Sequence, residues 1–415
     1  MEARRYAGGT VSTSPIPEWS EADIERLLAP VVRELPPPTS LAALPYDLSA
    51  GVPDRDSLPA DAIAAAAQRA LEADPSGALT YGGTQGYEPL RAWIAARQSA
   101  ETGLPLTADH VTLTSGSAHA IDNIAAAFLA PRDVVIVGAP TYPGAIRTFR
   151  ARGARIVDVP QDDDGIEMVS LASALERQRA LGAPAKLIYV VANYDNPSGS
   201  TLPLHRRHEL AQLAARYRAL VVEDDAYTGI DLDGPPPTSF LEVAGGKGIL
   251  RVGTFSKTIA TGLRVGWVVS DSTIIERLAF MRFDNGSSPL VQRTVLEYLQ
   301  SGTADEHVAN LRVLYRERRD ASAEALVEYC EPYAAFRKPA GGFFHWLRLH
   351  PGLDAQRVVE SAAQRGVAVT PGPNYYADGG GEDRLRLVYS ALPPDRLREA
   401  IRLLGQAFDE VAGGA

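Results

Sequence analysis

The chain has 415 residues, 45% of them hydrophobic and 22% charged, which allows two domains with a substantial core. A formal net charge of -10 argues against nucleic-acid binding, and the single cysteine, Cys330, excludes an intramolecular disulfide and a multi-cysteine metal site. The N-terminus lacks the apolar segment of a signal peptide and no apolar run reaches the length of a membrane span, so we expect a cytoplasmic protein with no membrane partner and no metal.

The first 46 residues are polar and rich in proline, and they predict an arm around one short helix, residues 21–34, rather than a domain. The alanine-rich run at residues 61–74 predicts a helix. A glycine-punctuated loop, YGGTQGYEPLRAW, then leads into a further helix at residues 89–102.

Short apolar, β-branched runs follow and alternate with helical patterns up to residue 288, which predicts a mainly parallel, doubly wound seven-stranded sheet in an α/β domain. The last run follows the sixth without an intervening helix, which allows an antiparallel strand there. The predicted strands are residues 111–113, 134–137, 156–159, 187–191, 220–222, 249–252 and 265–269.

From residue 289 the pattern changes to that of a smaller α+β domain. A long helical region, 290–329, precedes the strand-like segments GGFFHWLRL, GVAVT and RLRLVYS, with further helices at 354–365 and 394–408. The sequence therefore predicts an arm (1–46), a large cofactor-binding domain (47–288) and a small C-terminal domain (289–415). Whether the first residues of the large domain pack with the small one stays open.

Ligands of open α/β sheets bind beyond the carboxyl ends of the strands. Five of the predicted strands are followed by TSGSAHA, GAPTYPG, ANYDNPSG, EDDAY and GTFSK. The small residues of Ser115–Ser117 open a helix whose N-terminus can hold a phosphate. The hydroxyls of Thr254 and Ser256 and the guanidinium of Arg264 can complete that phosphate site.

The remaining strand ends carry groups that suit a pyridine ring. Tyr142 can stack on an aromatic ring, a carboxylate such as Asp224 can keep a ring nitrogen protonated, and Asn196 and Tyr227 can bond a ring oxygen. Lys257 can form a Schiff base and then transfer protons. Together these residues point to pyridoxal 5'-phosphate.

A family resemblance supports this prediction. SGSAHAIDNIAAAFL, GAPTYPGA, NYDNPSG, VVEDDAY, GTFSKTIATGLRVGW, PAGGFFHWL and LRLVYS resemble, in order and spacing, the motifs of the class I/II aminotransferases. That family has fold type I of the pyridoxal-phosphate enzymes, the aspartate aminotransferase-like fold. The resemblance runs from about residue 47 to the C-terminus.

The resemblance implies a role for individual positions. Lys257 matches the Schiff-base lysine, and Asp224 matches the partner of the pyridine nitrogen, because that acid precedes the tyrosine of DDAY by three; Glu223 and Asp225 are the competing choices. Tyr227 and Asn196 match the partners of the ring oxygen, Tyr142 the stacking ring, and Ser117, Thr254 and Arg264 the phosphate ligands, with Ala118 and Ser256 expected beside them. Lys257, Asp224 and Tyr142 are the expected catalytic residues.

Substrate and partner contacts are implied in the same way. Arg386 matches the arginine that binds the substrate α-carboxylate, with Arg384 as its competitor, because alternation along a strand puts both on one face. Asn196 and Gly51 are expected near the substrate. Tyr81 matches a tyrosine that reaches the phosphate in the other subunit, so a homodimer with shared active sites is implied.

Four positions depart from the family pattern or suggest other roles. Many relatives have glutamine where Ala118 or His119 stands, and Asp195 places an acid beside the cofactor asparagine. An isolated histidine on a helix face is more often structural than catalytic, which is our interpretation of His119. His345 is interpreted as core or pocket wall.

The predicted function is transfer of an α-amino group from an amino acid to a 2-oxo acid. The same machinery serves β- or γ-elimination or replacement, decarboxylation, cyclisation and oxidation in specialised metabolism, and the sequence does not separate these reactions from transamination. A regulator built on this fold would carry an N-terminal DNA-binding domain, for which the arm looks too short.

Overall fold

The computed structural model describes residues 18–34 and 44–413, and the chain divides into two compact units, Met1–Pro38 and Thr39–Ala415. The first unit contains α1 (Glu21–Leu27) and α2 (Pro30–Glu34). The prediction of one helix over residues 21–34 is wrong, because Leu28 is extended (φ -64, ψ 140) and Pro30 begins a new helix. Proline suits a first helical turn and disfavours helical backbone before it. The rest of the predicted arm, 1–17 and 35–43, lies outside the described residues.

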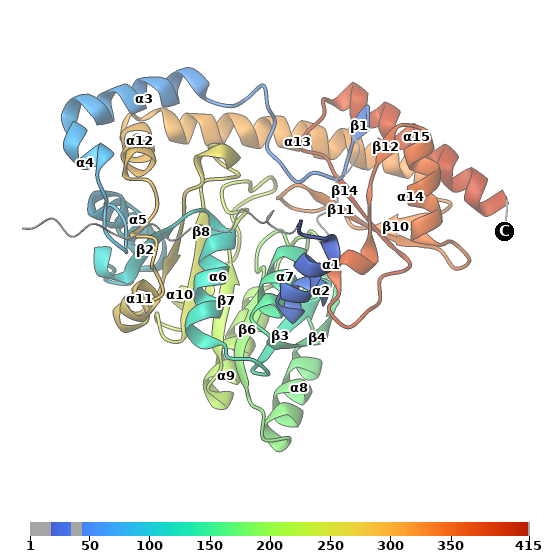
Figure 1. Ribbon diagram of the computed structural model, residues 1–415. Coiled ribbons are helices and arrows are strands. Elements are labelled where there is room, and N and C mark those ends of the chain that lie inside the picture. Colours follow the sequence, from blue (N-terminus) through green and yellow to red (C-terminus); the bar gives the residue numbers. More distant parts are fainter. Residues whose placement is uncertain (1–17, 35–43, 414–415) are drawn as a thin grey trace, which may run out of the picture. The chain divides into compact units, whose positions relative to one another are not determined.

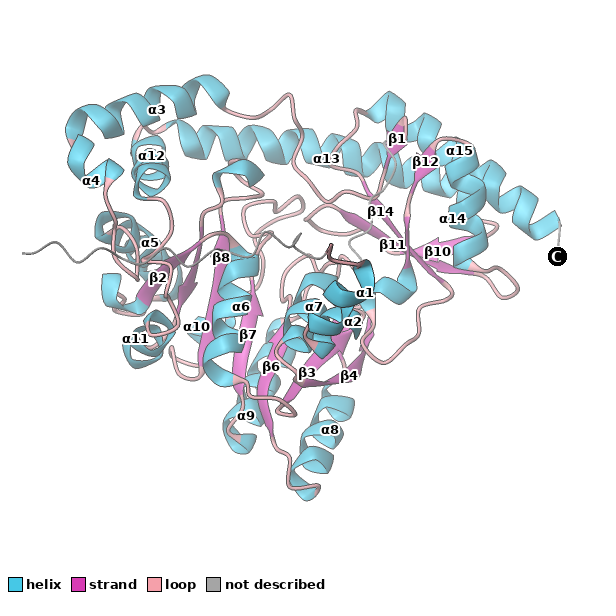
Figure 2. Ribbon diagram, in the orientation of Figure 1, coloured by secondary structure: helices cyan, strands magenta, loops and turns pink. Residues whose placement is uncertain are grey.

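The second unit is built on a sheet with the order β2-β9-β8-β7-β6-β3-β4-β5 (Figure 2). All seven predicted strands are confirmed: β2 (Val111–Thr114), β3 (Val134–Ala139), β4 (Arg155–Asp162), β6 (Ala185–Val190), β7 (Leu220–Asp224), β8 (Ile249–Thr254) and β9 (Gly266–Val269). β9 is antiparallel to both of its neighbours, and the other six run in one direction. A two-residue strand, β5 (Gly165–Ile166), turns back along β4.

Helices cover both faces of this sheet (Figure 1). Alternate residues of each strand enter different cores, so Val135 and Val137 face one layer and Val134 and Ile136 the other. Burial on both faces explains why these strands are continuously apolar in sequence. One layer consists of α6 (Ser117–Phe128), α7 (Pro143–Ala151) and α11 (Ser272–Ala279), and the other of α5 (Glu88–Thr102), α8 (Met168–Ala180), α9 (Leu204–Tyr217) and α10 (Phe240–Val243).

A second, antiparallel sheet has the order β10-β11-β14-β13. Its strands are β10 (Ala334–Phe336), β11 (Phe344–Leu349), β13 (Thr370–Pro371) and β14 (Arg384–Val388), and they share a core with α13 (Thr303–Cys330), α14 (Ala355–Gln364) and α15 (Pro394–Gly413). β1 (Tyr46–Asp47) pairs with β12 (Val367–Ala368), so the segment after the arm packs with the C-terminal part of the chain.

The remaining helices connect these parts. α3 (Ala60–Ala73) and α4 (Pro75–Leu79) contact α12 (Pro289–Gln300), and single 3-10 turns occur at Ala108–His110, Thr261–Leu263 and Gly372–Tyr375. The predicted helical region 290–329 is interrupted at Gly302, whose φ of +82° favours glycine. The domain limits at residues 46/47 and 288/289 stay a prediction. In the described part of the chain, every helix is too short or too polar to cross a membrane.

A fully buried arginine, Arg207 of α9, stabilises the chain at the carboxyl end of β6. Its guanidinium donates to the carbonyl oxygens of Leu202 (2.8 Å) and Ala192 (3.0 Å) and to Oδ1 of Asn193 (2.5 Å). Ala192 and Asn193 lie just before the loop that carries Asn196, and Leu202 lies just after it. The arginine therefore connects core packing to the position of a predicted site residue.

We expect Arg207→Leu to lower the free energy of unfolding by about 3–5 kcal/mol, because its buried acceptors would lose their partner. Arg206→Leu is the matched control. Arg206 pairs with the half-exposed Asp162 at the surface, and its loss should cost less than about 1 kcal/mol. Urea unfolding of both variants measures the difference, and equal losses would contradict this account.

Candidate active site

A cavity of about 260 Å³ lies at the carboxyl ends of the parallel strands. Every predicted site residue except Thr254 and Tyr81 lines it. The lining consists of Gly51, Ser117, Ala118, Tyr142, Val191, Asn196, Asp224, Ala226, Tyr227, Ser256, Lys257, Thr261, Arg264 and Arg386. The residues come from both sheets, so neither sheet alone could form this cavity.

Lys257 projects into the cavity from the loop after β8. Its Nζ donates to the carbonyl oxygen of Gly51 at 2.8 Å and lies 5.9 Å from the centroid of the Tyr227 ring. Burial, together with the positive charges of Arg386 and Arg264, lowers the pKa of Lys257 to about 8, against the opposing effect of Asp224. A far larger fraction of this amine is therefore neutral near neutral pH than in an ordinary lysine.

Asp224, at the end of β7, is buried and has one free oxygen. Tyr189 donates its hydroxyl hydrogen to Oδ2 at 2.6 Å, whereas Oδ1 has no partner among the described residues. Burial raises the pKa of Asp224 to about 6, opposed first by the Tyr189 hydrogen bond and then by Lys257. An unpaired, buried carboxylate oxygen in a cavity wall fits a protonated ring nitrogen as its partner.

The two competing acids are used elsewhere. Glu223 accepts from the backbone N–H of Phe240 at 3.1 Å, and Asp225 forms an ion pair with Arg251 at 2.6 Å. Neither lines the cavity. The three neighbouring acids thus have three separate environments, and Asp224 is the one that faces Lys257.

The N-terminus of α6 contributes Ser117 and Ala118 to the cavity lining. Gly116 is the N-cap, and Arg264 donates to the carbonyl oxygen of Ser115 at 3.0 Å. A Cβ on Gly116 would lie 2.5 Å from Arg264 Nη2, and one on Gly266 would lie 2.6 Å from the Gly116 carbonyl carbon. The close approach therefore requires glycine at both positions and leaves free N–H groups and a guanidinium, which fit a phosphate.

Thr254 is not brought into the cavity wall. Its side chain is buried behind Ser256, because Oγ1 donates to Ser256 Oγ at 2.9 Å, and Ser256 lines the cavity instead.

Tyr142 lines the cavity as the N-cap of α7, and a Cβ on Gly144 would lie 2.4 Å from the Tyr142 ring. Burial raises the pKa of the Tyr142 phenol, so that group stays neutral.

Arg386 reaches the cavity from β14 of the second sheet. Its guanidinium donates to Asn196 Oδ1 at 2.9 Å and to the carbonyl oxygen of Ser49, and it lies 4.7 Å from the centroid of the Phe344 ring. Arg384 instead pairs with its neighbour Asp383 at 2.6 Å. The structure therefore places Arg386, and not Arg384, beside Asn196.

Tyr81 lies outside the cavity, on the loop after α4. The residue is 85% exposed, and two other large apolar residues, Leu79 and Phe283, are 68% and 85% exposed. Within the described residues of one chain, Tyr81 does not line the cavity.

The two histidines and the acid that the sequence marked as unusual, His119, His345 and Asp195, each have a hydrogen-bond partner. The Nδ1 atom of His119 accepts the backbone N–H of Ser115 at 3.1 Å. His345 is buried with Nε2 2.7 Å from Ser322 Oγ, and burial lowers its pKa to about 3, which agrees with the interpretation as a core residue. Asp195 is also buried, and burial raises its pKa to about 7 although the Ser198 hydroxyl donates to it at 2.7 Å.

Tyr189 was not predicted from the sequence, because it stands in the apolar run 187–191, which looks like core. A buried tyrosine hydroxyl needs a hydrogen-bond partner. That requirement could have indicated a polar role for Tyr189 from the sequence, and its partner in the structure is Asp224.

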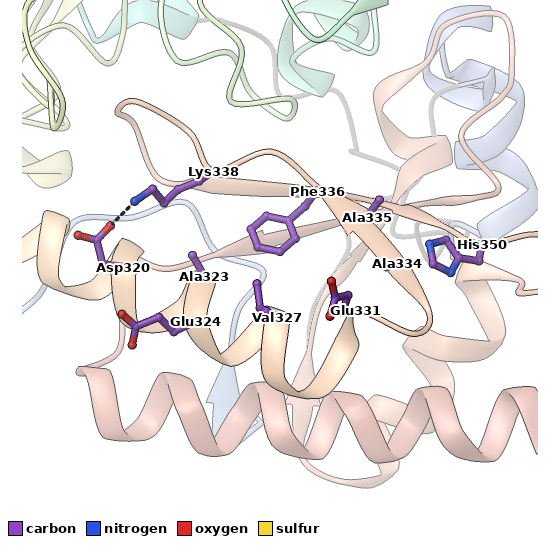
Figure 3. Close-up of a pocket in the computed structure, with 10 residues that line it drawn as sticks. All are labelled: Asp320, Ala323, Glu324, Val327, Glu331, Ala334, Ala335, Phe336, Lys338 and His350. Carbon is purple, nitrogen blue, oxygen red and sulfur yellow. Dashed lines mark hydrogen bonds and ion pairs between the residues drawn. The ribbon is translucent and has the colours of Figure 1, made fainter.

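A wider hollow, of about 900 Å³, lies between α13 and β10 (Figure 3). It contains none of the predicted site residues. Phe336 and Val327 lie at its centre, and the Asp320–Lys338 ion pair (3.3 Å) closes one end. This hollow lacks the convergence of lysine, free carboxylate and helix N-terminus found in the smaller cavity.

The two sheets and the lysine-bearing cavity between them define a fold type I pyridoxal-phosphate enzyme. The family model for aminotransferase class I and II matches residues 45–404, and the chain belongs to this family. It is a pyridoxal-phosphate-dependent aminotransferase.

Individual relatives agree. The chain is 31% identical over 367 residues to aromatic-amino-acid aminotransferase 1 of Thermococcus litoralis, covering 88% of each chain. It is 33% identical over 398 residues to the 2-aminoadipate transaminase of Thermus thermophilus, covering 94% of this chain and 97% of that one. The crystal structure of Pyrococcus horikoshii kynurenine aminotransferase with PMP superimposes with a TM-score of 0.88 at 30% identity, covering 94% of this chain and 98% of that one.

We expect covalent capture of added pyridoxal 5'-phosphate by the cofactor-free protein to accelerate with pH and level off above about pH 8, because only the neutral Lys257 amine attacks. The capture rate of an ordinary lysine, with a pKa of about 10.4, would continue to rise up to about that pH. Borohydride trapping followed by peptide mass measures the rate. Lys257→Ala should abolish capture, Lys247→Ala should not, and a rate still rising at pH 10 would contradict the shifted pKa.

Proposed function

We propose that this aminotransferase moves the α-amino group of an amino acid to a 2-oxo acid, with Lys257 as the proton-transferring base, Asp224 as partner of the ring nitrogen and Arg386 as ligand of the substrate α-carboxylate. The observation that carries the proposal is that these three side chains, from the end of β7, the loop after β8 and β14 of the second sheet, line one cavity of about 260 Å³. A base, an acid and a carboxylate ligand in one cavity are what transamination requires.

The residues that would hold the cofactor divide the cavity by chemistry. Oδ1 of Asp224 is free for the ring nitrogen, Tyr142 can cover the ring face, and Asn196 and Tyr227 can bond the ring oxygen. The phosphate would take the N-terminus of α6 at Ser117 and Ala118, with Ser256 and Arg264. Thr254 would act on it through Ser256. When bound, pyridoxal phosphate supplies an electron sink for the substrate Cα.

Three groups of this chain perform the remaining work. Lys257, with its lowered pKa, can hold or release a proton at Nζ near neutral pH. Tyr189 holds Oδ2 of Asp224, which leaves Oδ1 as the oxygen available to the ring nitrogen. Arg386 offers a planar fork for the α-carboxylate, held in orientation by Asn196 and the Phe344 ring.

Amino-acid donors taken from the names of the relatives test the reaction. With aromatic amino acids, 2-aminoadipate or kynurenine, we expect at least one donor to release its 2-oxo acid and to convert the bound cofactor to its amine form. Absorbance follows the cofactor and mass spectrometry the product. Release of ammonia, carbon dioxide or a side-chain fragment in place of the 2-oxo acid would refute transamination.

Arg386→Gln should raise the KM for that donor roughly tenfold to hundredfold, because a charge-assisted bond to the α-carboxylate contributes about 1.5–3 kcal/mol. Arg384→Gln is the matched control, since Arg384 stands two residues away on the same strand and pairs with Asp383. Its KM should stay within about twofold of wild type. Steady-state kinetics of both variants decide the matter, and the opposite order would exclude Arg386.

We also propose a homodimer in which Tyr81 completes the partner's phosphate site. The 85% exposure of Tyr81, together with the exposed Leu79 and Phe283, supports an apolar surface that a second copy covers.

The buried, free Cys330 supports a reducing, cytoplasmic location, which cell fractionation would test.

Mixing two inactive variants tests the shared site. A mixed dimer of Lys257→Ala and Tyr81→Ala chains carries one doubly altered site and one intact site. After co-refolding we expect about a quarter of wild-type activity, because half of the dimers are mixed and each has one working site. No recovery, with mixed dimers verified by affinity tags, would place Tyr81 outside the partner's site.

A further inference from the structure

We propose that His119 is a positioning residue of the phosphate-binding turn Ser115–Ser117, where its imidazole acts as a neutral hydrogen-bond acceptor. This inference rests on the proposed function, in which the turn and the N-terminus of α6 bind the cofactor phosphate. His119 does not line the cavity, so it would act through the turn.

The position of His119 in its helix explains the contact. α6 begins at Ser117 after the N-cap Gly116, which makes His119 the third helical residue, N3. In a capping box a glutamate or glutamine at N3 accepts a backbone N–H at the start of the helix. His119 does the same one residue earlier, because its Nδ1 accepts the Ser115 N–H at 3.1 Å.

Ser115 is held at each of its polar groups. His119 accepts its N–H, Ser287 Oγ lies 2.9 Å from its hydroxyl, and Arg264 Nη2 donates to its carbonyl oxygen at 3.0 Å. The N–H of Ser115 is thereby used by the histidine, and the cavity lining begins at Ser117 and Ala118. The histidine thus selects which N–H groups of the turn stay free for an anion.

The charges around His119 keep it able to accept. Arg282 and Asp284 face the ring from the segment after α11, and Asp122 faces it from α6 itself. Burial, and then Arg282, lower the pKa of His119, with the two aspartates opposing. Nδ1 accepts only in the neutral ring protonated at Nε2, so acid removes the acceptor and frees the Ser115 N–H.

Two variants of the holoenzyme separate the acceptor from simple packing. His119→Gln keeps an acceptor that cannot titrate, and His119→Leu keeps bulk without an acceptor. We expect His119→Leu to release pyridoxal 5'-phosphate roughly tenfold faster than wild type at pH 7.5, because the part-buried N–H of Ser115 loses its partner. His119→Gln should stay within about twofold of wild type.

The pH dependence is the second readout, measured as the release rate between pH 5 and pH 8. The phosphate also titrates in this range, but equally in every variant, so the difference between variants isolates His119. Wild type should release faster than His119→Gln as the pH falls, and the two should converge at pH 8. Identical profiles for these two variants, or slow release from His119→Leu, would overturn the proposal, and the first comparison holds even if His119→Leu does not fold.

Pyridoxal without its phosphate separates this inference from the proposed function. If the turn binds phosphate, wild type should retain pyridoxal far less well than pyridoxal 5'-phosphate, and His119→Leu should change retention of the phosphorylated form alone. Equal retention of both compounds by wild type would refute the phosphate site itself. Distinct retention with no effect of His119→Leu would refute only the role of His119.

Discussion

The common direction of β2, β3, β6, β7 and β8 is the constraint on which the site depends. These strands are buried on both faces, so functional side chains can leave the sheet only where the strands end. Six strands share one direction, and their carboxyl ends therefore meet at one edge. The N-terminus of α6, Tyr142, Asn196, Asp224 and Lys257 all follow from that arrangement.

Charged side chains buried at this edge of the sheet need partners within the protein. Asp225 accepts from Arg251 at 2.6 Å and from Asn193 at 2.9 Å, and Arg207 continues the network to Asn193. The network joins the residues that follow β6 and β7 to Arg251 within β8. Its charges are paired, whereas Asp224 and Lys257 face the cavity only partly paired, with pKa values of about 6 and about 8. The paired charges of Asp225 and Arg251 therefore support Asp224 and Lys257, which stay available for proton transfer.

The second sheet contributes what the first cannot. Arg386 of β14 enters the cavity between the Phe344 ring and Asn196, so one hydrogen bond connects the two sheets at the site. Gly51 adds a carbonyl oxygen for Lys257 from a segment far away in the chain. Substrate recognition and the reacting lysine thus depend on how the two sheets are packed together.

Local patterns predicted the strands and most of the helices, because apolar periodicity and turn residues act over a few positions. They failed where one residue interrupts a longer pattern, as at Pro30 and Gly302. Residue type at strand ends also indicated the chemistry of the cavity. Tyr189 escaped, because a tyrosine in an apolar run shows its polar role only when its partner, Asp224, is known.

The sequence by itself determined the class of fold, the cofactor and the residue types at each strand end, since these depend on local order and spacing. The family resemblance singled out Asp224 and Arg386 among neighbouring candidates, but only the tertiary structure shows how the surroundings of these neighbours differ. Glu223, Asp224 and Asp225 are adjacent acids, and burial against different partners separates them. Arg384 and Arg386 share one face of a strand, and the cavity reaches only the second. The reason is physical: these surroundings are made by contacts between segments far apart in the chain, which no local pattern contains.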